Sequence, residues 1–115
     1  MTTEHLITIS DNGFYRIFNG LKSIELRINT GRFRSIKEND ILKFIDKESR
    51  SILKKVFKIK EYSSFRECLI DNEKDLKKIN NMSESVEDSL DIYLKPKGIY
   101  TKTKEMNGVL AFYLE

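Results

Sequence analysis

Three charged side chains that could bind a ligand or take part in a reaction lie in the stretch "GLKSIELR", residues 20–27. Apolar and polar residues alternate here, which predicts a β-strand whose successive side chains point to opposite faces. Glu25 and Arg27 therefore share one face, and the long side chain of Lys22 reaches the same place from the start of the strand. Two cations can hold a phosphate or carbonyl while the carboxylate orients them or accepts hydrogen bonds from a base. An exposed ion pair worth at most about 1 kcal/mol explains the same pattern, so both interpretations stay open.

Other candidate ligand-binding residues surround this strand. Arg32 and Arg34 flank Phe33 in a segment predicted to be a polar loop, and guanidinium groups beside an aromatic ring suit a nucleic-acid strand. The alternative is that Phe33 closes the end of a barrel while both arginines point into solvent. His5 is a candidate general acid or base, or a base-stacking residue, against the alternative of a partly buried histidine at a strand start. Ser23 shares the polar face of the motif strand and joins the set.

Two further charged surfaces have both structural and functional explanations. Lys54, Lys58 and Lys60 fall at alternate positions of the predicted strand 51–62, so we expect them on one face. They form either a basic stripe for a nucleic acid or an edge strand protected against aggregation. A later helix carries an acidic face, which is either solvated or a protein-interaction surface. Its residues are Glu84, Glu87, Asp88 and Asp91.

The distribution of charge favours a phosphate-bearing partner. The chain has 115 residues, 34% of them charged, and a net charge of +3. Residues 1–66 hold 14 Lys and Arg against 8 Asp and Glu, whereas residues 67–115 hold 7 against 10. A basic first half suits RNA or a nucleotide, although lysine-rich surfaces are commonly only solvated.

Length and composition predict a single cytoplasmic domain over residues 1–115. No apolar run is long enough to span a membrane, and the start "MTTEHLITIS" lacks the basic region of a signal peptide, so we expect no membrane partner. Cys68 is the sole cysteine and cannot form an internal disulfide, which fits a reducing compartment. Since His5 is the sole histidine, we expect neither a metal site nor a cofactor. The oligomeric state is left open.

The apolar pattern predicts five or six strands and three or four helices. The expected strands cover residues 5–9, 22–28, 40–46, 51–62 and 108–114. The last of them is nearly continuously apolar and should be central or well covered. Helical spacing indicates helices at 11–20, 63–70 and 85–94, a loop or short helix at 100–106, and a polar, mobile segment at 71–82. Strands do not alternate with helices of crossover length, so we expect an α+β fold: a mixed or antiparallel β-barrel with flanking helices.

The first helix has the clearest helical pattern. Its expected apolar face comprises Phe14, Ile17, Phe18 and Leu21. Asp11 or Asn12 can cap its start, and Gly20 stands where a helix commonly ends.

These segments together resemble the ASCH domain family. The stretch "GLKSIELR" matches the family motif G-x-K-x-x-E-x-R at all four fixed positions. Three more family-like segments follow in the family's order, namely "SIKENDILKF", "VFKIKEYSSFRECL" and "NGVLAFYLE". The resemblance covers almost the whole chain and implies a PUA-like β-barrel that binds RNA or a nucleotide in a cleft beside the barrel. Carried over residue by residue, the cleft would be lined by Lys22, Glu25 and Arg27, and Gly20 would allow the close turn from helix to strand.

Two departures from the family pattern matter. Asn39 stands where the family commonly has glycine before Asp40, and asparagine tolerates the left-handed conformation that such a turn uses. The bacterial N4-acetylcytidine amidohydrolases, one branch of the family, have a threonine nucleophile at the position of Glu25, while their lysine corresponds to Lys22. The chain is therefore expected to lack that amidohydrolase activity.

The leading functional hypothesis is RNA or nucleotide binding, and it has two rivals. In the first, the chain is a metal-dependent ribonuclease or related hydrolase, with Glu25 and a nearby acid holding a divalent metal or acting as a base. In the second, it is a protein-interaction module that uses the acidic helix face. Tyr100, Lys102 and Lys104 precede the closing strand, in the region that would close the family's cleft.

Overall fold

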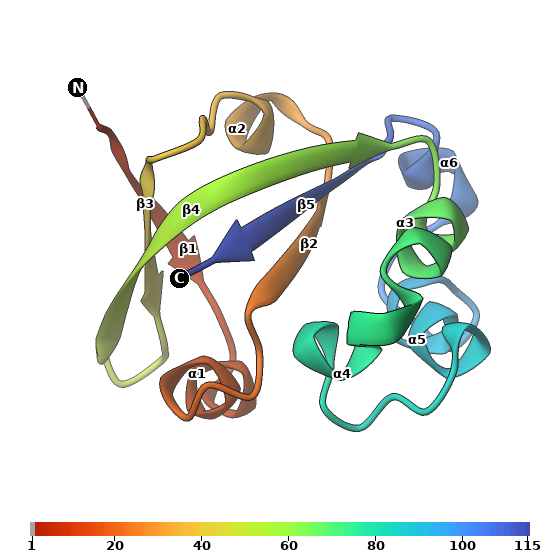
Figure 1. Ribbon diagram of the computed structural model, residues 1–115, viewed down its shortest axis with the longest axis horizontal. Helices are drawn as coiled ribbons and strands as arrows, with labels where there is room; N and C mark the ends of the chain where they lie inside the picture. Colours follow the sequence, from red (N-terminus) through yellow and green to blue (C-terminus); the bar gives the residue numbers. More distant parts are fainter. Residues whose placement is uncertain (1) are drawn as a thin grey trace.

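A five-stranded mixed sheet curls into a half-barrel in the computed structural model, which describes residues 2–115 (Figure 1). The strands are β1 (Glu4–Thr8), β2 (Ile24–Ile28), β3 (Ile41–Ile45), β4 (Ser51–Tyr62) and β5 (Val109–Leu114). Their order in the sheet is β1-β3-β4-β5-β2, with β1 parallel to β3 and the other pairs antiparallel. The predicted α+β barrel is confirmed, and its two edge strands are β1 and β2.

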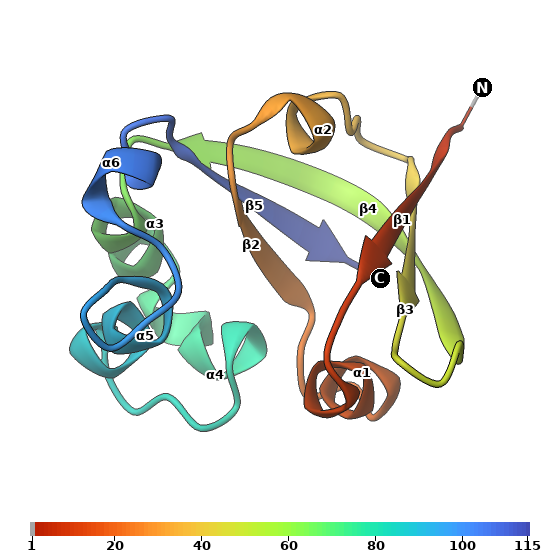
Figure 2. The same cartoon turned by 180° about the vertical axis from the view of Figure 1, so that it is seen from behind.

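The helices lie at the barrel ends and in one layer beside it. They are α1 (Asp11–Phe18), α2 (Gly31–Arg34), α3 (Phe65–Asp71), α4 (Leu76–Ile79), α5 (Val86–Tyr93) and α6 (Lys102–Glu105), with a 3₁₀ turn at Glu73–Asp75. Helices α1 and α2 stand at opposite ends of the barrel, and α3 to α6 gather beside β2 and β5 (Figures 1 and 2). The described residues thus hold more helices than predicted, because α2, α4 and α6 have four residues each and show no full apolar period.

Two hydrophobic clusters sit on the two faces of the sheet. The barrel-interior cluster includes Ile17, Phe44 and Phe112. The outer cluster lies between the sheet and the helical layer and includes Leu26 and Phe65. All residues of β5 are buried, because this strand lies between β4 and β2 and serves both clusters. The prediction of a central closing strand is confirmed.

Helix α1 begins and ends differently from the predicted helix. Its cap is Ser10, whose Oγ accepts a hydrogen bond from the Gly13 N–H at 3.1 Å, and not Asp11 or Asn12. Gly20 turns the chain with a φ of 74°, in the left-handed region that glycine adopts easily. The predicted apolar face is only half buried. Phe14 and Ile17 enter the core, whereas Phe18 and Leu21 are exposed.

The predicted mobile segment 71–82 is folded. Leu76 is 7% exposed and Ile79 is 1% exposed, and both belong to the outer cluster. This prediction was wrong because two apolar residues one turn apart were outnumbered by their polar neighbours. Serine caps begin the helices on either side: Ser64 Oγ accepts from the Glu67 N–H, and Ser85 Oγ accepts from the Asp88 N–H.

A β-bulge divides β4 into two halves. Val56 pairs with Leu114, but Lys58 pairs with the adjacent Tyr113, so Phe57 is an extra residue on this strand. An extra residue shifts the alternation by one position, and the faces of the strand exchange there.

The bulge separates the three lysines that were expected on one face. Lys54 lies opposite Leu42 of the barrel-interior cluster. Lys58 lies opposite Tyr113 of the outer cluster, and Lys60 lies on the same face as Lys58. The predicted basic stripe is therefore wrong, since it combines residues from both sides of the sheet.

Candidate functional site

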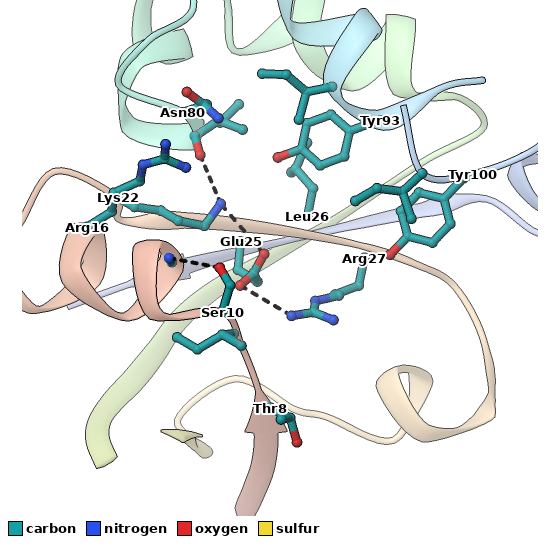
Figure 3. Close-up of a pocket in the computed structure, with 15 residues that line it drawn as sticks. Thr8, Ser10, Arg16, Lys22, Glu25, Leu26, Arg27, Asn80, Tyr93 and Tyr100 are labelled. Carbon is teal, nitrogen blue, oxygen red and sulfur yellow. Dashed lines mark hydrogen bonds and ion pairs between the residues drawn. The ribbon is translucent and has the colours of Figure 1, made fainter. Parts of the chain in front are cut away.

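A cavity of about 290 Å³ opens between edge strand β2, helix α1 and the helical layer (Figure 3). Charged side chains from α1 and from the start and middle of β2 line it, namely Arg16, Lys22, Glu25 and Arg27. Tyr93 of α5 and Tyr100 line the opposite side. We refer to this cavity as the cleft.

The alternation of side chains along β2 places the charged motif residues at the cleft. Ile24, Leu26 and Ile28 are 3%, 2% and 5% exposed and pack in the outer cluster. Glu25 and Arg27 consequently point to the other face, where both line the cleft. The structure therefore brings the motif residues together, as the spacing predicts.

Glu25 forms the floor of the cleft between two cations. Its side chain is 8% exposed, yet Lys22 Nζ lies 3.6 Å from Oε1 and Arg27 Nη2 lies 3.6 Å from Oε2. Charge-assisted hydrogen bonds between such groups are about 2.7–2.9 Å long. In Figure 3 both cations converge on the carboxylate from opposite sides. Since neither contact is a short hydrogen bond, a ligand can accept hydrogen bonds from Lys22 and Arg27 and donate one to Glu25.

Lys22 also connects the barrel to the helical layer. Its Nζ donates a hydrogen bond of 2.8 Å to the carbonyl oxygen of Ile79, the last residue of α4. This bond holds the ammonium group over the cleft while its remaining donors face the cavity and Glu25. The lysine therefore has an architectural contact as well as a place in the site.

The aromatic side of the cleft is rigid. Phe65 stacks on Tyr93 with ring centroids 4.9 Å apart and on Tyr100 with centroids 5.7 Å apart. Gly98 packs so closely against the end of α5 that an added Cβ would lie 2.5 Å from the backbone nitrogen of Leu94. This close approach, together with a 2.7 Å bond from the Tyr100 N–H to the Tyr93 carbonyl, fixes Tyr100 at the cleft. Burial raises the pKa of Tyr93 above its ordinary value, so its phenol is neutral.

Arg27 connects the cleft to the end of the barrel through its contact with Phe33. Its Cζ lies 5.3 Å from the centre of the Phe33 ring, and the Cζ of Arg32 lies 5.5 Å from the same point. Phe33 itself packs against the barrel-interior cluster, which agrees with the interpretation that it closes the barrel. The arginines lie over this ring, so Phe33 supports guanidinium groups.

Arg34 and Ser23 have structural partners and do not line the cleft. Arg34 Nε donates to Asn29 Oδ1 at 3.0 Å, and its Nη2 donates to the Asn29 carbonyl at 3.2 Å. The Ser23 N–H donates to the Lys78 carbonyl, and the Ser23 carbonyl accepts from the Leu114 N–H. A ligand-binding role for these two residues stays a prediction.

His5 lies apart from the cleft, between β1 and the turn before β3. Its Nε2 is 2.8 Å from Asp40 Oδ2, and the backbone N–H groups of Lys37 and Thr3 also bond this carboxylate, at 3.0 and 3.1 Å. The hydrogen bond from His5, followed by that from Lys37, lowers the pKa of Asp40 to about 2. The structure thus gives His5 a carboxylate partner outside the cavity.

Sequence reasoning missed several residues that line the cleft, among them Arg16, Asn80 and Tyr93. The pattern of α1 contained a signal for the first, since Arg16 lies one helical turn after Gly13 on the face opposite the aromatic residues. The others come from α5 and the end of α4, far away in the sequence, and no local pattern marks them. Tyr100 was in the region expected to close the cleft, whereas Lys102 and Lys104 do not line it.

Residues 2–115 contain neither a cluster of metal ligands nor a membrane-spanning helix. No group of three or more His, Cys, Asp or Glu side chains there is arranged to hold a metal ion. None of the helices in this range has the length and apolar character needed to cross a membrane. Burial raises the pKa of the Cys68 thiol to about 12, so it is not a thiolate at neutral pH.

Solved structures similar to this chain decide its fold. The hypothetical protein PH0355 superimposes with a TM-score of 0.82 at 26% identity, covering 98% of both chains. Protein PF0455 from Pyrococcus furiosus gives 0.74 at 26% identity, over 98% of this chain and 96% of that one. ASCH from Zymomonas mobilis gives 0.66 at 13% identity, over 98% of this chain and 67% of that one. The chain has an ASCH-like fold.

The resemblance inferred from the motif is therefore confirmed at the level of the fold. No protein-family model and no curated protein matches the chain. At 13% identity the likeness to ASCH from Zymomonas mobilis concerns the fold alone, so the chemistry of this ASCH-like cleft has to be argued from its own residues.

Proposed function

We propose that this ASCH-like domain binds RNA or a nucleotide in the cleft. Lys22 and Arg27 hold a phosphate, and the base lies against the tyrosine side of the cavity. Glu25 keeps the two cations in place and accepts hydrogen bonds from a base edge. We expect binding without chemical conversion, in the cytoplasm, since a single cysteine fits a reducing compartment.

The observation that carries the proposal is the open arrangement around Glu25. A carboxylate that makes no short hydrogen bond within the protein has its oxygens free for water or a ligand. Glu25 is buried between two cations that both stop at 3.6 Å, and all three groups face one cavity. Among the described lining residues, three cations face one carboxylate, so the local field attracts phosphate.

The size of the cleft fits a small ligand. Binding pockets for small molecules start at about 300 Å³, close to the volume of this cavity. Such a volume suits one base or one nucleotide. The stacked rings behind the tyrosine side lose little freedom when a ligand binds, because they are already held in place.

The direct test replaces the cleft cations. In Arg27→Gln and Arg16→Gln, affinity for a labelled single-stranded RNA should fall roughly tenfold or more, because a hydrogen bond to a charged group is worth about 1.5–3 kcal/mol. Fluorescence anisotropy measures this. Lys22→Ala should show the same loss together with a lower melting temperature, since it also removes the bond to Ile79.

The matched control is Arg66→Gln. Arg66 is an exposed arginine that pairs with Glu87 at 2.7 Å on the helical layer, so this change removes the same charge away from the cleft. RNA binding should stay within about twofold of the parent protein, because a distant exposed charge is largely screened. If the cleft variants bind RNA as this control does, the cleft is not the site.

No observation favours either rival function. Among the described residues that line the cleft, Glu25 is the single carboxylate, whereas a metal-dependent nuclease commonly uses several. Labelled RNA incubated with the protein, with and without magnesium or manganese, tests that rival. Acetate release from N4-acetylcytidine tests the expected lack of amidohydrolase activity, and release that Lys22→Ala abolishes would contradict it.

The acidic face of α5 is largely neutralised within the chain. Glu84 pairs with Lys77 at 3.1 Å, Glu87 with Arg66 at 2.7 Å and Asp91 with Lys97 at 3.3 Å. The Asp88 carboxylate accepts a hydrogen bond from the Glu84 N–H. These contacts agree with a solvated helix face.

A further inference from the structure

The two arginines of α2 differ in what their guanidinium groups contact. The Arg34 side chain donates two hydrogen bonds to Asn29, and the Asn29 side chain donates one to Glu61 of β4. Arg34 therefore connects α2 to the end of β2. Within residues 2–115, Arg32 has no acidic partner and its side chain donates no hydrogen bond. Its backbone is fixed, because the Ser35 Oγ donates to the Arg32 carbonyl at 2.8 Å.

Arg32 is connected to the cleft by one aromatic ring, that of Phe33. It lies over Phe33, and Arg27 of the cleft lies over the same ring. Arg27 is balanced by Glu25, whereas Arg32 adds a second positive charge beside it. Two cations on one aromatic ring raise the local positive potential, which an approaching anion lowers. The arrangement thus presents an exposed donor group over the Phe33 ring, which Arg27 of the cleft also contacts.

We infer that the ligand of the cleft is a single strand of nucleic acid at least two nucleotides long, and not a free mononucleotide. This inference rests on the proposed function. One nucleotide enters the cleft with its phosphate at Lys22 and Arg27, and Arg32 binds the neighbouring phosphate beyond Phe33. A mononucleotide can use the first contacts alone.

The form of the cleft explains why the strand is single. The cavity of about 290 Å³ receives one base between the tyrosine side and the charged floor. A base paired in a duplex has to leave its stack to reach such a pocket, whereas a single strand offers its bases directly. Phosphate contacts supply most of the affinity and little sequence preference, so Arg32 should extend the binding site without reading the base.

The experiment compares two probes on one variant. The probes are a labelled random-sequence RNA hexanucleotide and a mixture of the four ribonucleoside monophosphates, followed by anisotropy and by NMR titration. Arg32→Gln should weaken hexanucleotide binding about tenfold, lower the slope of log affinity against log salt by about 1, and leave mononucleotide binding unchanged. Arg66→Gln is the control for loss of one exposed arginine, and should change neither probe.

Each outcome separates this inference from the proposed function. If Arg32→Gln weakens both probes equally or neither, the inference falls while the cleft remains a binding site. A parent protein that binds the monophosphates as tightly as the hexanucleotide overturns it too. If Arg27→Gln changes no binding at all, the proposed function fails and the inference fails with it. Arg32 is exposed and its side chain has no hydrogen bond in the described part of the chain, so the variant should melt at the parent temperature.

Discussion

Two buried carboxylates in this molecule have nearly equal exposure and opposite surroundings. Asp40 is 5% exposed and Glu25 is 6% exposed. Asp40 accepts three hydrogen bonds of 2.8 to 3.1 Å, from His5 and from the N–H groups of Lys37 and Thr3. The cations beside Glu25 stop at 3.6 Å and a cavity opens above it. The first carboxylate connects the start of the chain to the turn before β3, whereas the second faces an open cavity.

The comparison shows that burial and charge alone do not identify a site. Asp40 follows Asn39, which adopts a φ of 75°, so the left-handed turn expected from the asparagine is confirmed. This turn brings the carboxylate under the first residues of β1, where backbone donors satisfy it. Glu25 lies on a regular edge strand, where no turn supplies such donors, so its partners are the side chains of Lys22 and Arg27.

The largest effect should come from removing the well-bonded carboxylate. Asp40→Ala leaves the Thr3 and Lys37 N–H groups and the His5 ring without their acceptor. Each hydrogen bond to a charged group contributes about 1.5–3 kcal/mol, so loss of three of them should lower the free energy of unfolding by about 3 kcal/mol or more. Urea unfolding followed by circular dichroism measures it. A loss below about 1 kcal/mol would contradict the role given to this carboxylate.

Acid should act on the same carboxylate. The pKa of Asp40 is about 2 in the folded protein and about 3.8 in the unfolded chain. Its contribution to stability is therefore complete above about pH 4 and is lost as the pH falls toward 2. Unfolding free energies measured across this range should fall less steeply in Asp40→Asn than in the parent protein. Equal slopes would mean that Asp40 is not linked to folding.

Changing the other carboxylate should alter binding more than stability. Glu25→Gln keeps the shape of the side chain but removes the charge that holds Lys22 and Arg27 in place. We expect RNA affinity to fall about tenfold, while the free energy of unfolding changes by about 1 kcal/mol or less, because both cations remain in contact with an open cavity. Anisotropy and urea unfolding of one preparation give both values. A stability loss as large as that of Asp40→Ala would remove the distinction between the two carboxylates.

The smallest effect should come from His5. His5→Gln retains a donor for Asp40 and lies outside the cleft, so stability should fall by about 1 kcal/mol and RNA binding should stay unchanged. The same RNA titration checks this. Weaker RNA binding at equal stability would indicate that His5 belongs to the binding site.

Local patterns in the sequence predicted the parts of the fold with long regular alternation. The shared face of Glu25 and Arg27 follows from the alternation of β2, and the central place of β5 follows from its continuous apolar run. The motif strand and the cleft floor were predictable because the residues that define them are neighbours along the chain.

The rest of the cleft depends on residues distant in sequence. Tyr93 and Asn80 reach the cavity because α4 and α5 pack on the outer cluster, and single-element patterns contain no information on that packing. The four-residue helix α4 escaped prediction because Leu76 and Ile79 form less than one apolar period. The family resemblance predicted the charged residues at the floor of the cleft. It did not indicate that Arg34 donates hydrogen bonds to Asn29 while Arg32 is exposed.

The extra residue at Phe57 has a consequence for how this chain can evolve. The two halves of β4 alternate in opposite phase, so a one-residue deletion elsewhere in either half would turn the side chains beyond it to the wrong face. Loss of Phe57 alone would close the bulge and leave Val56 and Lys58 opposite Leu114 and Tyr113, so both faces of the strand would be kept. We therefore expect natural length variation within β4 to be confined to the bulge, and otherwise to gather in the turn at residues 47–50 and in the loop at 80–84.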